Sequence, residues 1–348
     1  MPKMSSAFSR RDFIKKSTLA ITSLSILPFA EIIPAPSVPR LGRVTSASLS
    51  VHKEPSENSS ILFQRVRDDI LKIYNDVVSE DGPGYNPIWH KVWGGYVHSG
   101  FVQRVRNHLN PIMKSFPSSG QLMEVTVPFT QSYRIRSSKN WEARYRLYYS
   151  SNHYVSDILE GPDGDAYYKV NFPLLTLSYY VRALHLRAVS EDEFTPIHPD
   201  IDPRDKRIEI DLDFQKLRAF EKDTLVKEFY VSTGRPNRSI DPHAIPTETP
   251  RGNHIIRNKR PTVHMGVGDV SILRSDGDYP GVPWVSYFEP VTGVAIHGTY
   301  WHNNYGMTMS AGCINMQSEE AKWIYRWCTA GINDSAVDTT FHTPVLVY

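Results

Sequence analysis

The spacing of apolar residues changes along the chain, and the first regular pattern is helical. Between residues 61 and 78, apolar side chains recur three and four positions apart. This spacing places one face of a helix against a core, so we expect an amphipathic helix within residues 59–80. It would end at the breaker cluster SEDGPG, residues 79–84. The apolar positions are Ile61, Leu62, Val66, Ile70, Ile73, Tyr74 and Val77.

From residue 85 to residue 204 the pattern becomes short runs in which apolar and polar residues alternate, separated by Gly, Pro, Asn and Asp turns. Such alternation predicts half-buried strands. Residues 94–105 (GGYVHSGFVQRV) and 178–189 (SYYVRALHLRAV) share one pattern: an aromatic residue and a valine, a turn, then a second apolar run. The pattern resembles the closing strands of bacterial SH3-like modules, in one or two copies. This region could bind the cell wall, position a substrate or serve only as a structural spacer, and the sequence does not decide among these roles.

A third pattern begins after an acidic, proline-bearing connector, and we place a domain boundary near Asp205. Strands are predicted at Ile208–Leu212, Leu217–Phe220 and Leu225–Ser232, joined by polar turns, which indicates an antiparallel β meander. Residues 319–330 (EEAKWIYRWCTA) predict a helix with an apolar stripe. We therefore expect a mainly β protein whose last domain spans residues 205–348.

The first 30 residues predict an export signal of the twin-arginine type. The adjacent Arg10 and Arg11 precede an apolar run from Thr18 to Ala30. That run of about 13 residues is short for a membrane span, which needs about 20. Residues 31–58 are rich in Pro and Ser and predict a linker. The signal implies a protein that works in the periplasm, the cell wall or outside the cell, and meets the membrane only during export.

Charge and cysteine content narrow the function classes. The 39 Lys and Arg against 37 Asp and Glu give a net charge of +2, which argues against a nucleic-acid-binding face. Two cysteines are too few for a disulfide framework. Cys328 lies in the predicted helix and is interpreted as a small core residue. The sequence does not exclude a disulfide between Cys313 and Cys328, which would prevent Cys313 from acting as a thiolate.

Cys313 and His297 form the candidate chemical pair. A cysteine nucleophile needs a thiolate, which a neighbouring histidine or a helix N-terminus favours. Gly312 allows a sharp turn that exposes the thiol and points backbone N–H groups into one space, as in an oxyanion hole. His297 lies at the end of the predicted strand GVAIHG, residues 293–298, which would hold a base rigidly. These residues alone leave open whether the pair is catalytic or two ordinary core residues.

A series of ordered motifs surrounds this pair. They are STGRP (232–236), PTETPRGNHII (246–256), VPWVSYF (282–288), IHGTYWHNNYG (296–306), SAGCINM (310–316) and TPVLVY (343–348). Together they resemble the L,D-transpeptidases with the YkuD-type catalytic domain, over about residues 206–348. That family's signature is His-Gly, a gap in the mid-teens, Ser/Thr-His-Gly-Cys, an apolar residue, then Asn or Arg. The matching residues here are His297, Gly298, Ser310, Gly312, Cys313, Ile314 and Asn315.

The resemblance implies a YkuD-like β-sandwich and a covalent mechanism on peptidoglycan stem peptides. Cys313 would attack the carbonyl between the L-centre and the D-residue of a tetrapeptide stem, with His297 as the base and the Gly298 carbonyl as the third member. An amine acceptor would give a 3→3 cross-link, and water would make the enzyme an L,D-carboxypeptidase. No cofactor is expected.

The same resemblance suggests which residues surround the reacting atoms. The backbone of Ala311, Gly312 and Cys313 would form the oxyanion hole. Substrate contacts are expected from four further residues: Tyr300, Trp301, Ser310 and Asn315. Tyr300 and Trp301 suit an aromatic wall, but they equally suit a role as core aromatics.

Ala311 departs from the family pattern, which has His at this position. If the imidazole supports the thiolate, its loss lowers or abolishes turnover. If the position supplies only a backbone N–H, alanine keeps that donor. The alternative function is therefore a non-catalytic or weakly active protein that binds the cell wall or serves as a scaffold.

A metal centre is the remaining chemical alternative, because the last domain holds several histidines. None of them has a recognised ligand spacing, and HGTYWH predicts a strand and a loop instead of a helical ligand pair. We therefore expect no metal. The histidines considered are His254, His264, His297 and His302.

Overall fold

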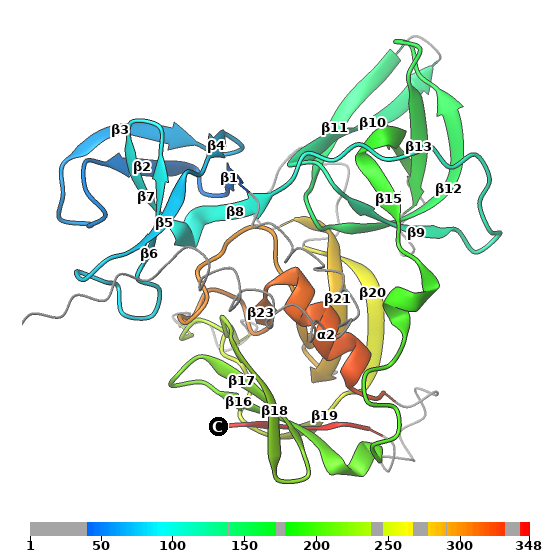
Figure 1. Cartoon of the computed structure of the whole chain (residues 1–348). Coiled ribbons are helices and arrows are strands. Elements are labelled where there is room, and N and C mark those ends of the chain that lie inside the picture. Colours follow the sequence, from blue (N-terminus) through cyan, green and yellow to red (C-terminus); the bar gives the residue numbers. More distant parts are fainter. Residues whose placement is uncertain are drawn as a thin grey trace, which may run out of the picture. The chain divides into compact units, whose positions relative to one another are not determined.

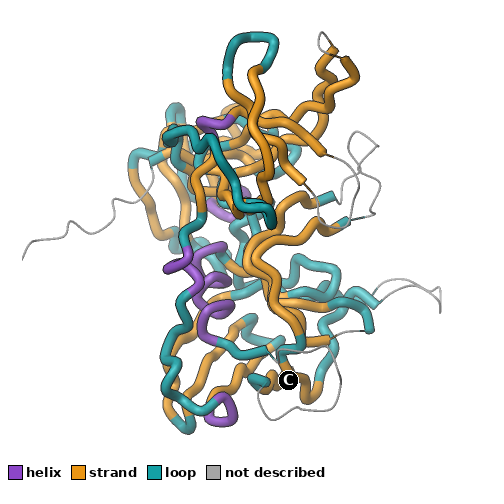
Figure 2. The backbone as a smooth tube through the Cα atoms, turned by 90° about the vertical axis from the view of Figure 1, so that its right-hand side faces the viewer, coloured by secondary structure: helices purple, strands orange, loops and turns teal. Residues whose placement is uncertain are grey.

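The structure is a computed structural model that describes residues 40–137, 140–171, 178–237, 246–266, 278–289, 291–330 and 342–348. The predicted mainly β class is confirmed: strands dominate Figure 1, and Figure 2 shows how little of the chain is helical. Among the described residues, no helix has the length and apolar character needed to cross a bilayer. The predicted export signal and the first part of the predicted linker lie outside the described residues.

Residues 40–105 form a small β unit, which we call the N-terminal β unit, built from two sheets in the orders β4-β1-β8 and β3-β2-β7-β6-β5. Buried valines and leucines fill the space between the sheets, including Val51, Leu71 and Val97. The strands are β1 (Leu41–Val44), β2 (Ser48–His52), β3 (Ile61–Val66), β4 (Ile70–Lys72), β5 (Asn75–Val78), β6 (Ile88–Val92), β7 (Gly95–His98) and β8 (Val102–Val105).

The predicted helix within residues 59–80 is wrong, because this segment forms β3, β4 and β5. The chain turns at Asp68, whose φ of 70° is incompatible with a continuing right-handed helix. Several apolar residues that gave the helical spacing are exposed on strands, such as Ile61 at 55% and Val66 at 57%, so they do not report a buried face. A pattern of apolar residues predicts a period only where those residues share one core.

The predicted linker and the boundary at residue 85 are also wrong in part. β1 and β2 lie within residues 31–58, so ordered structure begins before the linker was expected to end. β5 and β6 pair across residue 85, with Val78 opposite Ile88. The residues on both sides of that boundary therefore belong to one folded unit.

Residues 121–188 form the middle β unit, a seven-stranded sheet in the order β11-β10-β14-β13-β12-β9-β15. The two segments with repeated sequence share one local structure: β7 and β8 flank the 3-10 turn η1 (Ser99–Phe101), and β14 and β15 flank η2 (Ala183–His185). The SH3-like assignment stays a prediction. The strands are β9 (Gln121–Val125), β10 (Phe129–Ser137), β11 (Asn140–Tyr148), β12 (Asn152–Glu160), β13 (Ala166–Asn171), β14 (Ser178–Arg182) and β15 (Leu186–Ala188).

The C-terminal domain contains two sheets, β18-β17-β16-β24-β19 and β20-β21-β22-β23, that share one core with the helix α2 (Figure 1). The predicted meander and the predicted helix are confirmed. Ile208, Ile296 and Ile324 bring side chains from both sheets and from α2 into that core. The strands are β16 (Lys206–Asp211), β17 (Lys216–Glu221), β18 (Thr224–Tyr230), β19 (Gly252–Ile255), β20 (Asn258–Met265), β21 (Tyr279–Glu289), β22 (Val294–Gly298), β23 (Ile314–Met316) and β24 (Pro344–Val347), and α2 spans Ser318–Trp327.

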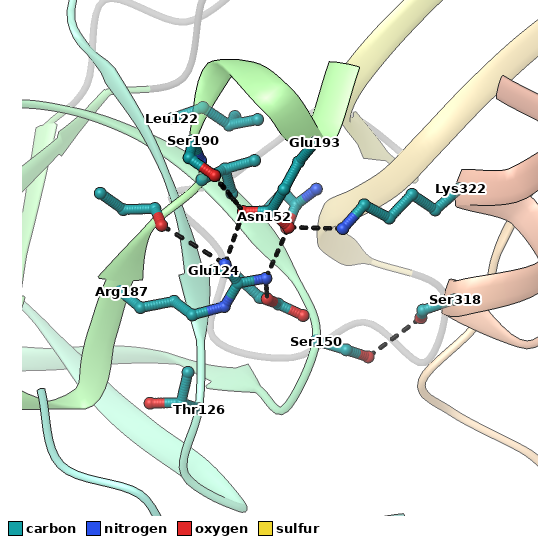
Figure 3. A network of polar contacts seen from close by, with 12 residues as sticks. Leu122, Glu124, Thr126, Ser150, Asn152, Arg187, Ser190, Glu193, Ser318 and Lys322 are labelled. Atoms are coloured by element: carbon teal, nitrogen blue, oxygen red, sulfur yellow. Dashed lines mark hydrogen bonds and ion pairs between the residues drawn. The ribbon is translucent and has the colours of Figure 1, made fainter. Parts of the chain in front are cut away.

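A polar network joins the middle β unit to α2 (Figure 3). The Arg187 guanidinium donates to both carboxylate oxygens of Glu193, at 2.7 and 2.9 Å, and also pairs with Glu124. Glu193 belongs to the turn η3 (Glu191–Phe194) and forms an ion pair with Lys322 of α2. The hydroxyls of Ser150 and Ser318 lie 2.9 Å apart. These contacts link the middle β unit to α2.

Buried histidines make the fold sensitive to acid. Desolvation lowers the pKa of His90 and His297 to about 4, and that of His153 and His302 to about 3. In the unfolded chain these groups titrate near their ordinary pKa of about 6.5. Between about pH 4 and pH 6.5 the unfolded state therefore binds more protons, so the stability of the fold falls as the pH is lowered through this window.

We predict that His153→Gln flattens this pH dependence, because one fewer proton is then taken up on unfolding. Urea unfolding at pH 7 and pH 5 measures the effect as the difference in free energy between the two conditions. The control His108→Gln changes an exposed side chain and should leave the difference unchanged. Equal pH dependence in the His153→Gln variant and the original protein would contradict the assignment.

Candidate active site

The parallel pairing of β22 with β23 places Cys313 and His297 on one face of a sheet. Ile296 lies opposite Ile314, and His297 lies opposite Asn315. Both isoleucines face the core shared with α2. Because side chains alternate along a strand, His297 and Cys313 project from the other face. Cys313, directly before β23, thus lies level with Ala295, two residues from His297 and at the neighbouring position on the same face.

The orientation of His297 is set by its own neighbour in sequence. The side chain is 2% exposed, and Nδ1 lies 2.9 Å from the carbonyl oxygen of Gly298. A carbonyl only accepts, so Nδ1 carries the proton and donates it, which leaves Nε2 as the basic nitrogen. Gly298 therefore occupies the position predicted for the third member of the catalytic set.

The surroundings of both groups favour their neutral forms. Burial lowers the pKa of His297 to about 4, against the opposing effect of the Gly298 carbonyl. Burial among apolar side chains raises the pKa of the Cys313 thiol above its ordinary value, although a backbone contact with Ala295 acts in the other direction. At neutral pH the resting site therefore holds a thiol and an uncharged imidazole.

The loop before Cys313 is held by hydroxyl groups. Ser310 Oγ accepts from the N–H of Gly312 at 3.1 Å and donates to the carbonyl of Cys313 at 2.6 Å. Gly312 has a φ of +122°, which favours glycine at this turn. The N–H of Gly312 is therefore engaged inside the loop, and the backbone N–H groups of Ala311 and Cys313 are the candidate oxyanion donors.

Thr249 links this loop to the STGRP segment. Its buried hydroxyl accepts from the N–H of Gly234 at 2.9 Å and donates to the carbonyl of Gly312 at 2.7 Å. Gly234 must lack a side chain, because a Cβ there would lie 2.2 Å from the carbonyl oxygen of Thr247. In addition, Ser232 exchanges backbone hydrogen bonds with Asn315 at 2.8 and 3.0 Å. The segment thereby fixes the loop on both sides of the cysteine.

The predicted substrate-contact residues occupy different environments. Trp301 lies beside the site, with its ring centre 5.7 Å from that of His297. Tyr300 is 2% exposed, and its hydroxyl donates to the carbonyl of Pro280. It is therefore a buried residue that packs against Trp301. Asn315 is also buried, with its amide 2.9 Å from Nε2 of His302. A direct substrate contact by Tyr300, Asn315 or Ser310 stays a prediction.

Three residues of the site had no predicted role: Thr249, His302 and Tyr287. Thr249 stands in the motif PTETPRGNHII, which carried the signal without indicating the hydrogen bonds. Tyr287 pairs with Ala295 on β22 and packs in the apolar cluster that includes Cys313. His302 appears only as one histidine of a loop, so its contact with Asn315 depends on the fold.

The structure bears on two alternatives from the sequence, a Cys313–Cys328 disulfide and a metal centre. Cys313 and Cys328 are both free thiols, so the disulfide does not form in this structure. Within the described residues, no group of three or more His, Cys, Asp or Glu side chains is arranged to hold a metal ion. His254 instead contacts the carbonyl of Pro250 at 3.1 Å through Nε2.

Comparison with known proteins identifies the C-terminal domain. Residues 205–347 match the L,D-transpeptidase catalytic domain, YkuD. A putative L,D-transpeptidase YkuD of Bacillus licheniformis is 31% identical over 123 residues, which cover 35% of this chain. The chain spans 59% of the length of that relative. Residues 205–347 therefore form a YkuD-type L,D-transpeptidase catalytic domain.

Solved structures of the same class are also similar to this chain. The catalytic domain of the E. faecium L,D-transpeptidase is 26% identical and is covered to 98%, against 42% of this chain, with a TM-score of 0.30. An L,D-transpeptidase from Xylanimonas cellulosilytica is 24% identical, with 41% of this chain and 60% of that chain covered and a TM-score of 0.28. These TM-scores are low, so the domain assignment rests on the sequence match.

We predict that Thr249→Val destabilises the protein by about 1–3 kcal/mol, because it leaves buried backbone groups of Gly234 and Gly312 without a partner. Urea unfolding measures the change. Thr249→Ser keeps the hydroxyl and should recover most of the loss. The control Thr247→Val removes an exposed hydroxyl that donates to the Arg235 carbonyl, and it should cost much less. Equal losses for the two valine variants would contradict the role of Thr249.

Proposed function

We propose that the protein is a cysteine acyltransferase that acts on the peptide stems of peptidoglycan. The observation that carries this proposal is the arrangement of Cys313 and His297 on one face of the β22–β23 ladder, with Nδ1 of His297 anchored to Gly298. A nucleophile beside a base that a third group orients is the general pattern of nucleophilic catalysis. The YkuD match of residues 205–347 adds the class of substrate.

The first half-reaction forms a thioester. Cys313 gives its proton to Nε2 of His297 as the sulfur attacks the carbonyl between the L-centre and the terminal D-residue of a tetrapeptide stem. The oxyanion that forms is stabilised by backbone N–H groups of the Ala311–Cys313 loop. When the C–N bond breaks, the imidazolium of His297 protonates the leaving amine, and D-alanine departs.

The second half-reaction transfers the acyl group. An amine from another stem attacks the thioester and gives its proton to His297, and the collapse of the second tetrahedral intermediate releases the Cys313 sulfur, which regains the proton. The product is a 3→3 cross-link. Attack by water in place of the amine would give a carboxylic acid, which is the L,D-carboxypeptidase reaction.

Because Cys313 and His297 are both neutral at rest, proton transfer between them does not precede the attack on the carbonyl. Because burial raises the pKa of Cys313 and lowers that of His297, the thiolate and imidazolium form together with the attack. Charge separation in a desolvated site is costly unless it is stabilised at once. The electrophilic carbonyl and the oxyanion donors supply that stabilisation, so the thiol stays unreactive until an acyl donor is bound.

Ala311 is the feature that separates an active enzyme from a wall-binding or scaffold protein. The residue is exposed, and the turn around it is held by Ser310 and Thr249 without an imidazole. These contacts support the account in which position 311 supplies only its backbone. The non-catalytic alternative needs the thiol to remain unreactive toward an acyl donor.

We also propose that the chain is exported and works on the cell wall. Arg10 and Arg11 followed by the apolar run Thr18–Ala30 support a twin-arginine route. Such a route delivers a folded protein, which suits an enzyme whose site depends on long-range contacts. Peptidoglycan, the proposed substrate, lies outside the membrane.

We predict that a carbapenem such as ertapenem forms a single covalent adduct on Cys313, visible as a mass increase of the intact protein. Cys313→Ser should give no adduct, and His297→Gln should slow acylation on the order of 10²-fold, because the base is lost. Cys328 is 2% exposed and serves as an internal control that should stay unmodified. A reduced protein that shows an intact Cys313 after prolonged exposure would contradict the enzyme and favour the scaffold.

We further predict that Ala311→His changes the rate of this acylation by less than about threefold, because the backbone N–H is the same in both residues. The measurement is the second-order rate constant from a time course of intact mass. A tenfold or larger gain would show that the absent imidazole limits the reaction.

A further inference from the structure

The loop of residues 300–306 carries Trp301 and His302 beside the candidate active site, and its outer side rests on the N-terminal β unit. We propose that this unit completes the active site and that Arg43 is the positioning residue for the 300–306 loop. The inference rests on the proposed function, because it concerns how the acyl donor is held against Cys313.

Arg43 makes the central contact. Its side chain is buried at 2% exposure, and Nη2 donates to the backbone carbonyl of Tyr300 at 2.6 Å, across 257 residues of sequence. The same nitrogen and Nε donate to Oε1 of Gln103 at 2.8 and 3.2 Å. Nη1 donates to Oδ1 of Asp68 at 2.9 Å. The planar guanidinium thus ties the N-terminal β unit to the loop in fixed directions.

The middle β unit closes the same network. Asp68 is 6% exposed at its side chain, and its second oxygen accepts from Nη1 of Arg146 at 2.5 Å. The ring of Tyr148 lies 4.1 Å from the guanidinium carbon of Arg43 and stacks on Tyr300, with ring centres 5.5 Å apart. Tyr300 is therefore held through its ring by one unit and through its carbonyl by the other.

Burying the charged Arg43 side chain costs free energy, so stability alone does not explain this arrangement. Burial lowers the pKa of Arg43, which means that the environment disfavours its charge, although the nearby Asp68 offsets part of that effect. Apolar residues of similar volume often stabilise a core as well as or better than a buried ion pair does. What the guanidinium adds is direction, because it fixes one backbone carbonyl relative to two other groups.

The rest of the loop also rests on the N-terminal β unit. The N–H of Asn303 donates to the carbonyl of Gly100 at 2.8 Å. Gly100 leaves room for Asn304, since a Cβ at position 100 would lie 2.5 Å from its Oδ1. Gly306, with a φ of +99°, passes so close to Tyr85 that a Cβ would lie 3.1 Å from it. The unit therefore contacts the loop at its beginning, middle and end.

The inner side of the loop reaches the reacting groups. Trp301 lies next to His297, and His302 lies next to Asn315, which pairs with His297 in the β22–β23 ladder. A shift of the loop would move the wall against which an acyl donor packs, without removing Cys313 or its base. A misplacement of about 1 Å can cost on the order of 10²-fold in the rate of a reaction that depends on a positioned substrate. A small reagent that the site does not position is not subject to this loss.

The test compares two reactions of Cys313 in the full chain. Ertapenem must fit the site to acylate the thiol, whereas iodoacetamide needs little more than access to it. We expect Arg43→Met to reduce the rate of ertapenem acylation at least tenfold and to change iodoacetamide alkylation less than threefold. Arg43→Lys keeps the charge near Asp68 and should recover part of the acylation rate.

Arg187→Met is the matched control. Arg187 also forms ion pairs through a guanidinium. Its partners are Glu193 of η3 and Glu124 of β9, and neither belongs to the 300–306 loop. It should lower thermal stability and leave the ratio of the two rates within threefold of the original protein. A ratio that is unchanged in Arg43→Met, or that changes equally in Arg187→Met, would overturn the proposal.

Hydrogen exchange keeps the proposal testable if Arg43→Met does not fold or if the original protein does not react with ertapenem. In Arg43→Lys, amides of residues 300–306 should exchange at least fivefold faster, while those of β16 and β17 should not change. Unreactive protein with this exchange difference would refute the proposed function and support the positioning role. Unchanged exchange in the loop would refute the positioning role by itself.

Discussion

The parallel pairing of β22 with β23 is the constraint on which the site depends. It aligns His297 with Asn315, and Cys313, two residues before Asn315, occupies the neighbouring position on the same face. Other features serve to keep that pairing in place: α2 packs behind it, and Thr249 fixes the loop that leads into β23. A slip of two residues that paired His297 with Gln317 would move the thiol away from its base and leave the core pattern intact.

Desolvation is the second physical theme, and it acts on both reacting groups at once. The apolar cluster that surrounds Cys313 raises the pKa of its thiol, and burial of His297 lowers the pKa of the imidazole. The two shifts keep the thiol protonated in the resting site. In the proposed mechanism, the reaction then depends on how well the bound acyl donor and the oxyanion donors receive charge, so the geometry of the surrounding loops would have a direct chemical role.

Local patterns in the sequence predicted those parts of the fold whose burial is also local. The strands β16 and β17 and the helix α2 have one buried face each, so their periods were informative. The helix expected at residues 61–78 failed because exposed residues such as Ile61 contributed to the pattern. Ordered motifs located Cys313, His297 and Gly298. The contact of Arg43 with Tyr300 had no signal in the sequence, because a buried arginine acquires its partners only when distant segments fold together.

Mass spectrometry of the reaction with a disaccharide tetrapeptide carrying a free stem amine tests the central claim most directly. The account predicts a transient thioester on Cys313, release of one D-alanine for each acyl group transferred, and a cross-linked dimer or a tripeptide acid as the product. The His297→Gln variant should slow the formation of all three. Intact substrate, retained D-alanine and unmodified Cys313 in the folded, reduced protein would contradict the account.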